Sequence, residues 1–185
     1  MKKLIYLIII LVFCHSFITA KTVNYQLIPS LSQLSFKVKY LVFLSLEAHC
    51  YDFQGEIKLN FDNMLHSKLT GTAKVNSIST GKHIIDSKLY SSRFLAAQSY
   101  PIITFESVEI TKNHQNKYTV RGFLTAKGIT APIKEDLSII ELEEGQIILS
   151  ANLSLNRKQF NIAPTIPSVL IDDLIKVSIK FVVEE

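Results

Sequence analysis

The stretch Ile175-Lys176-Val177-Ser178-Ile179-Lys180-Phe181 decides the fold class of this 185-residue chain, because apolar and polar residues alternate along it without interruption. A period of two places one face of a β-strand on a core and the other face in water. Residues 34–40, 118–124 and 147–155 repeat the alternation, and turn-forming residues lie between these segments. The pattern indicates an all-β sandwich or barrel rather than alternating helices and strands.

One segment, residues 81–100, breaks this alternation. Its apolar residues follow a spacing that is closer to helical than to extended: Ile84, Ile85, Leu89, Phe94 and Leu95. Pro101 ends any helix there, since the residue before a proline disfavours the α conformation. The spacing predicts a short helical insertion at about residues 82–98, packed on or over one end of the sheet. No internal repeat of about 20 to 50 residues is visible, which excludes solenoids and propellers. A single domain is expected, because the sequence contains no obvious linker.

The N-terminus has the pattern of a secretory signal peptide. Met1-Lys2-Lys3 precedes an apolar run over residues 4–13, and the small Ala20 follows. The run is too short to cross a bilayer, which takes about 20 residues. We therefore expect cleavage of residues 1–20, a mature domain of residues 21–185, and a periplasmic or secreted location. Lipidation at Cys14 is the alternative, but Phe13 is larger than the residue that normally precedes a lipidated cysteine.

Charge and motifs exclude several classes of function. Without Lys2 and Lys3 the chain has 18 Lys and Arg against 16 Asp and Glu, which argues against nucleic acid as the main partner. The four histidines of the mature chain are scattered, with no spacing typical of metal ligands. Neither an activated nucleophile nor a spaced acid/base pair can be named. The sequence predicts no metal, no cofactor and no catalysis.

Several motifs resemble those of the YceI-like family. They are Asp86-Ser87-Lys88-Leu89, Tyr100-Pro101-Ile102-Ile103-Thr104-Phe105-Glu106-Ser107, residues 118–125, residues 128–132, and Asn156-Arg157 with Phe160. The resemblance covers nearly the whole mature chain in order. It implies an exported, lipocalin-like antiparallel barrel of eight strands with a helical insertion, which binds a long apolar chain such as a polyisoprenoid.

A barrel of eight strands has an interior that either fills with side chains or holds one small ligand. The resemblance together with the inward faces of the strands predicts a set of apolar ligand contacts: Phe36, Val38, Tyr40, Phe43, Leu89, Phe94, Phe105, Leu124, Leu149, Ile179 and Phe181. An apolar chain gains about 0.8 kcal/mol per buried methylene, so a lipid can bind without a polar anchor. The same residues suit a dry, filled core, and the sequence leaves both alternatives open.

Three places raise further questions about ligand and partner. Lys88 stands where the family usually has histidine, and it is either a cation for a phosphate or carboxylate head group or simply solvated. Arg157 is expected to bond carbonyls and carboxylates first, with head-group contact as its second role. Residues Leu41 to Leu46 contain five large apolar side chains in six positions. Four interpretations of this run are open: a lip over the pocket, an edge that touches a membrane, a homodimer contact, or a segment buried under the insertion.

The leading hypothesis for function is an exported carrier or buffer for a long-chain lipid, without catalysis. The alternative is an interaction protein with a filled barrel, which docks a membrane-enzyme partner through its apolar edge. An enzyme acting on the bound lipid comes third, because no catalytic group can be assigned.

Overall fold

The structure is a computed structural model that describes residues 21–114 and 116–185. The predicted signal peptide and Cys14 lie outside the described residues. The strands and the helix are β1 (Val23–Leu27), β2 (Gln33–Tyr40), β3 (Leu44–Cys50), β4 (Phe53–Leu59), β5 (Lys68–Lys74), β6 (Ile78–Ser79), α2 (His83–Tyr90), β7 (Ile102–His114), β8 (Lys117–Ala126), β9 (Ile129–Glu141), β10 (Gln146–Asn156) and β11 (Ile171–Glu184). Short 3-10 turns lie at Pro29–Leu31, Met64–His66, Val75–Ser77, Glu143–Gly145 and Arg157–Phe160.

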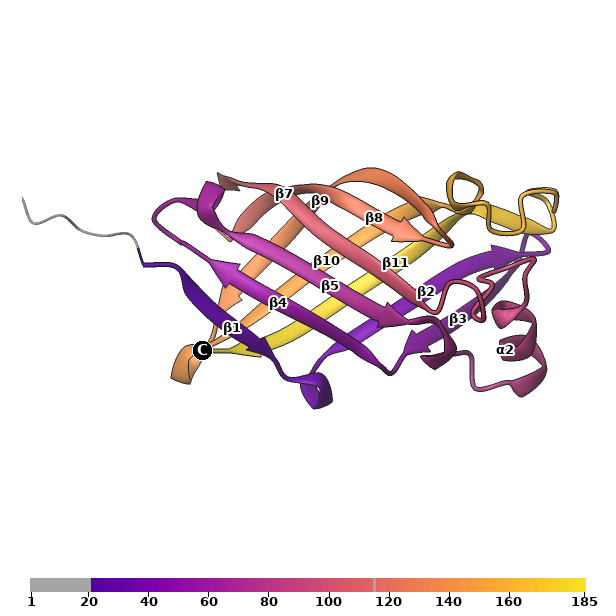
Figure 1. Cartoon of the computed structure of the whole chain (residues 1–185), viewed down its shortest axis with the longest axis horizontal. Coiled ribbons are helices and arrows are strands. Elements are labelled where there is room, and N and C mark those ends of the chain that lie inside the picture. Colours follow the sequence, from indigo (N-terminus) through magenta and orange to yellow (C-terminus); the bar gives the residue numbers. More distant parts are fainter. Residues whose placement is uncertain (1–20, 115) are drawn as a thin grey trace, which may run out of the picture.

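The strands close into an antiparallel barrel with eight strand positions, two of which are each occupied by two shorter strands (Figure 1). β1 and β2 lie end to end along one edge of β11, and β3 and β4 lie end to end along β2 and β1. These two interrupted strands join β5, β7, β8, β9, β10 and β11, each paired with the next along the chain. Pairing of Leu27 with Val183 closes the ring. The expected eight-stranded antiparallel barrel is confirmed.

Proline explains the interruption between β1 and β2. Pro29 has no backbone N–H to donate to a ladder, so the strand leaves the sheet for one 3-10 turn. The hydroxyl of Ser32 then replaces a ladder partner, since it accepts from the backbone N–H of Val182 at 2.9 Å and donates to the same residue's carbonyl at 3.3 Å. The barrel wall stays hydrogen-bonded across the kink.

The helical insertion is shorter than the predicted range of residues 82–98. α2 spans His83–Tyr90, and hydrogen-bonded turns continue from there to Tyr100. Asp86 ties the helix to the barrel, since its carboxylate accepts from Ser79 Oγ at 2.5 Å and from Thr80 N and Oγ1 at 2.8 and 2.7 Å. Within the described residues, no helix is long and apolar enough to cross a membrane.

The two ends of the barrel differ. At the mouth end lie α2 and the segments 41–43, 75–101, 127–128 and 157–170, and at the closed end lie the connections 60–67 and 142–145 (Figure 1). The half next to the closed end holds the largest buried cluster: Ile57, Leu59, Met64, Ile110, Tyr118, Val120, Leu137, Ile139, Ile147, Leu149 and Val183.

Candidate functional site

A cavity of about 740 Å³ occupies the half of the barrel next to the mouth end. Residues of α2, such as Leu89, and of the 157–170 segment, such as Ile166, contribute to its wall, whereas no residue of the described 60–67 and 142–145 connections does. Ligand pockets typically measure about 300–1,000 Å³. The filled-barrel interpretation is therefore wrong for this half of the molecule and correct for the closed half.

Small inward residues create this space. Gly55 of β4 pairs with Gly71 of β5, and both line the cavity where a side chain would otherwise stand. Alanines occupy further wall positions on other strands, at Ala48, Ala73 and Ala126. In the closed half the corresponding inward positions carry Ile, Leu and Tyr, which meet across the barrel. Because packed interiors leave few voids, the change in side-chain size sets where the barrel is hollow.

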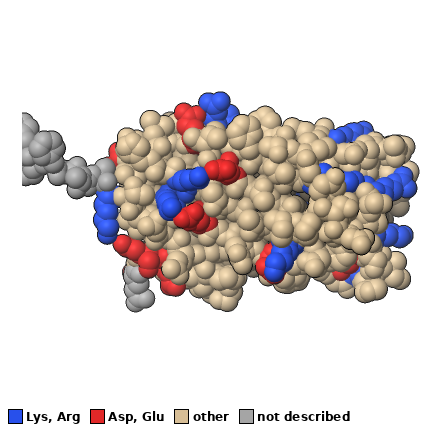
Figure 2. Space-filling model, viewed as in Figure 1, with Lys and Arg blue, Asp and Glu red and all other residues tan. Residues whose placement is uncertain are grey.

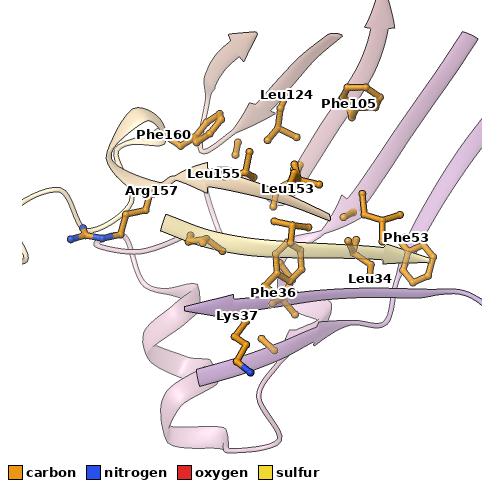
Figure 3. Close-up of a pocket in the computed structure, with 18 of the residues that line it drawn as sticks. Leu34, Phe36, Lys37, Phe53, Phe105, Leu124, Leu153, Leu155, Arg157 and Phe160 are labelled. Carbon is orange, nitrogen blue, oxygen red and sulfur yellow. The ribbon is translucent and has the colours of Figure 1, made fainter. Parts of the chain in front are cut away.

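Ten of the eleven predicted apolar contacts line the cavity: Phe36, Val38, Tyr40, Leu89, Phe94, Phe105, Leu124, Leu149, Ile179 and Phe181. Their side chains come from β2, β7, β8, β10, β11 and the insertion, and Figure 3 shows several of them pointing toward one another. Phe43 does not line the cavity, and its side chain is 91% exposed at the tip between β2 and β3. That the ten wall residues contact a ligand stays a prediction.

The ring of Phe105 packs directly on the backbone of the neighbouring strand. A Cβ atom at Gly122 of β8 would lie 2.7 Å from Phe105 Cε2 and would also meet the carbonyl of Glu106. A glycine is therefore needed here for close approach rather than for turn geometry. The contact holds the Phe105 ring against the wall and leaves the centre of the barrel open.

Arg157 is almost fully buried at 1% exposure, and its guanidinium is fully occupied. It donates to the carbonyls of Asp172, Ile162, Ala163, Ile166 and Ile171 and to the carboxylate of Asp173 at 2.9 Å. Figure 3 shows the group pointing away from the apolar side chains. All five N–H groups of a guanidinium are used by such a set, so Arg157 acts as a clamp on the 157–173 segment.

Lys88 lies on α2 at the rim of the cavity and is exposed. Its ammonium makes no hydrogen bond or ion pair with the described part of the chain, so it remains available to a head group at the mouth. The helix presents Leu89 to the cavity as well. Lys37 of β2 borders the same space, but Figure 3 shows its side chain directed away from the apolar cluster.

Glu135 of β9 is a cavity residue that the sequence analysis missed. It pairs with Val120, a residue of the packed cluster, and it alternates with the inward residues Ile133 and Leu137. Its side chain is half-buried. This burial raises the pKa of the Glu135 carboxyl, and the nearby negative charge of Asp136 raises it further by a smaller amount. The sequence feature that identifies it is a carboxylate on the otherwise apolar face of the segment Ala131 to Ile139.

Comparison with known sequences places these features in a family. The sequence model of the YceI-like domain matches residues 25–183. The chain is 32% identical over 107 residues to a UPF0312 protein of Pectobacterium carotovorum, and 33% identical over 100 residues to one of Yersinia enterocolitica. These matches cover 58% and 54% of this chain and 55% and 52% of the relatives. The chain thus spans about half the length of the curated relatives it matches.

Solved structures share the barrel. BcnA of Burkholderia cenocepacia aligns with a TM-score of 0.80 at 20% identity, over 84% of this chain and 98% of its own. A Campylobacter jejuni YceI protein aligns with a TM-score of 0.72 at 25% identity, over 80% and 90% of the two chains. A polyisoprenoid binding domain from Saccharophagus degradans, implicated in plant cell wall breakdown, aligns with 0.69 at 13% identity, over 86% and 97%. These likenesses show a common fold.

Proposed function

The chain belongs to the YceI-like family, and from this premise we propose that it holds one long apolar chain, a polyisoprenoid or a related lipid, inside the barrel. The observation that carries the proposal is the cavity of about 740 Å³ with its apolar wall. Burial of an apolar chain there gains about 0.8 kcal/mol per methylene. The polyisoprenoid binding domain that shares the fold supports the same class of ligand.

The protein acts as a non-catalytic carrier or buffer for this lipid. The charged residues at the cavity are Lys37, Lys88, Glu135, Asp136 and Arg157; Lys37 and Asp136 are exposed, and the Arg157 guanidinium donates to backbone carbonyls. A lone lysine at the rim and a lone carboxyl on the wall do not form an acid/base pair across a substrate. The pattern of residues 1–20 supports export, so the proposed location is the periplasm or the extracellular space.

The mouth loop, residues Leu41 to Leu44, supports contact with a membrane. Val42 is 56% exposed, Phe43 91% and Leu44 49%, so the tip of the β2–β3 hairpin presents apolar side chains to solvent. Leu41 and Val42 adopt positive φ angles of 49° and 67°, a conformation that glycine or asparagine adopts at less cost. A strained turn with large apolar side chains in solvent is unfavourable for the isolated protein, so a contact outside the barrel, here with a membrane, accounts for it better.

Charge favours a bilayer of anionic lipid as the surface that meets the mouth loop. The segments at the mouth end, residues 41–43, 75–101, 127–128 and 157–170, contain six Lys and Arg and one Asp. That aspartate is Asp86, whose carboxylate is buried and hydrogen-bonded, and Arg157 is buried and hydrogen-bonded as well. Five basic residues remain near the surface of this end, of which Lys158 pairs with Asp173. Figure 2 shows basic side chains at this end and most acidic ones toward the other. Each basic residue near an anionic membrane contributes about 1 kcal/mol, so the mouth would face the lipid source.

Mass spectrometry of an organic extract tests the ligand. Protein purified from the periplasm of its own cell should release an isoprenoid or another long-chain lipid in near-stoichiometric amount. A parallel preparation of Phe105→Leu should remain folded and retain less lipid, since the ring lines the cavity. A native preparation that yields no lipid, and takes none up from vesicles, would instead favour the interaction protein that docks a membrane enzyme.

A further inference from the structure

Glu135 lies at the floor of the cavity. Val120, its partner on β8, and Leu137, the next inward residue on β9, both belong to the packed cluster of the closed half. Toward the mouth, the next inward residue on β9 is Ile133, which lines the cavity. Val120 and Leu137 line the cavity as well, so the carboxyl lies beside the packed side chains that form the floor of the cavity.

The carboxyl of Glu135 has no hydrogen-bond or ion-pair partner within residues 21–114 and 116–185. By contrast, Asp86, Asp173 and Glu109 all have such partners. The pairing of β9 with β10 ends at Leu137 and Ala151, so the strands separate next to Glu135. Because no buried side-chain oxygen of the described residues lacks a hydrogen-bond partner, the oxygens of Glu135 are accessible, and a donor in the cavity can bond to them.

We propose that Glu135 is the hydrogen-bond anchor for the head group of the bound lipid, and that it selects a neutral head group with a donor, such as a hydroxyl or an amide N–H. This inference rests on the proposed function, since it assigns the polarity of a ligand held in the same cavity. A donor placed at the floor satisfies the carboxylate oxygens. Burial, which already raises the pKa of Glu135, strengthens such a bond.

The same carboxyl disfavours an anionic head group at the floor. Two negative charges in a cavity of low dielectric repel each other much more strongly than in water. Lys88 at the rim attracts an anion instead, so a carboxylate or phosphate lipid would have to bind with its head outward. The cavity therefore distinguishes two orientations, a donor head group at Glu135 or an anionic one at Lys88.

Three probes with one chain length separate these orientations: hexadecanol, methyl hexadecanoate and hexadecanoate. They differ in whether the head group donates a hydrogen bond, only accepts one or carries a negative charge. Displacement of a fluorescent apolar reporter measures the affinity of each. The wild-type protein should bind hexadecanol about tenfold more tightly than hexadecanoate, the ratio expected of one hydrogen bond to a charged group. The ester should lie between them.

Variants assign the preference to one side chain. Glu135→Leu should bind hexadecanol no better than the ester, and Glu135→Gln should keep hexadecanol and improve hexadecanoate about tenfold, because the amide retains hydrogen bonding without charge. Glu184→Gln makes the same chemical change at an exposed position of β11 and should alter nothing. If Glu135→Leu does not fold, the nearly isosteric Glu135→Gln still decides the question.

The outcomes separate this inference from the proposed function. If the wild type binds all three probes equally, or prefers hexadecanoate in a way that Lys88→Gln abolishes, the anchor is refuted while lipid binding stands. If no probe displaces the reporter and no vesicle lipid is taken up, the proposed function fails, and the anchor fails with it.

Discussion

The closed half and the hollow half of the barrel are built from the same strands with the same alternation, yet only one of them is packed. β4 shows the difference within a single strand, because Leu59 belongs to the packed cluster alone, Ile57 belongs to the cluster and also borders the cavity, and Gly55 borders the cavity alone. β8 repeats the change, with Tyr118 in the cluster alone, Val120 in both the cluster and the cavity wall, and Leu124 and Ala126 in the wall alone. The period of the pattern therefore builds the wall, and the size of the inward side chains decides whether the interior is filled.

The two halves also differ in what holds their ends. Apolar packing stabilises the closed half, with Leu59, Ile110 and Val183 at 0% exposure. At the mouth end a smaller apolar cluster around Phe160 is supplemented by polar contacts, since Asp86 binds α2 to the residues before it and Arg157 clamps the 157–173 segment. A molecule that must admit a ligand keeps its less stable elements at the entrance, as is common for binding sites.

Truncation of one isoleucine in each half should give the largest contrast. Ile110→Ala in the packed cluster should lower the free energy of unfolding by about 2–5 kcal/mol, because it removes a fully enclosed side chain. Ile179→Ala at the cavity wall should cost less than half as much, since that side chain already borders open space. Urea unfolding at equilibrium measures both. Equal losses would mean that the hollow half is packed in solution.

Loss of the Asp86 carboxylate should loosen the mouth end alone. Asp86→Asn is expected to cost about 1–3 kcal/mol, because buried donors of Ser79 and Thr80 lose a charged acceptor. Hydrogen exchange should accelerate in α2, whereas the amides of β10 and β11 should exchange as before. Uniform acceleration across the barrel would show that the insertion is part of one cooperative unit.

The same variant should also change the response to acid. Burial alone would raise the pKa of Asp86, but hydrogen bonds from Ser79 and Thr80 outweigh it, so the pKa lies below its ordinary value. A carboxyl with a lowered pKa in the folded state stabilises the protein above the unfolded pKa of about 3.9, and this contribution is lost as the pH falls through the folded value. Wild type should therefore lose its advantage over Asp86→Asn below about pH 4.

Glu135→Gln should act in the opposite direction and by a smaller amount. Burial raises the pKa of Glu135, so the folded protein is penalised when the carboxyl is ionised. Near neutral pH, the ligand-free variant should be more stable than the wild type by less than about 1 kcal/mol. This gain should shrink as the pH falls through the raised pKa. Thermal unfolding against pH, with Glu184→Gln as the control, measures the difference.

Replacement of the mouth loop should have the smallest effect on stability. Phe43→Ser with Leu44→Ser should change the free energy of unfolding by less than about 0.5 kcal/mol, because both side chains are largely exposed. Flotation with phosphatidylglycerol vesicles should nevertheless fall, and high salt should weaken the remaining binding. Unchanged flotation together with loss of a dimer in sedimentation would identify the loop as a contact between two copies of the chain.

Resemblance and pattern together predicted most of the wall. Ten of eleven predicted positions line the cavity because a strand has only two faces, so alternation determines which side chains point inward. Phe43 was misplaced because it lies in a turn, where the period of two no longer applies. Glu135 is not among the predicted contacts, because the predicted wall contains only apolar and aromatic side chains, although its position in the alternation of β9 places it inside.

Local periodicity along the chain is enough to predict several strands, the place of the insertion and the inward face of those strands. That the interior is hollow next to α2 and packed at the other end follows only from the assembled barrel. The assembled barrel also shows that backbone carbonyls and Asp173 occupy the Arg157 guanidinium, while the Glu135 carboxyl has no partner in the described part of the chain. Both outcomes depend on residues that eight strands bring together from distant parts of the chain. The total volume of the inward side chains and the hydrogen-bond partners of each polar group therefore cannot be derived from any local pattern.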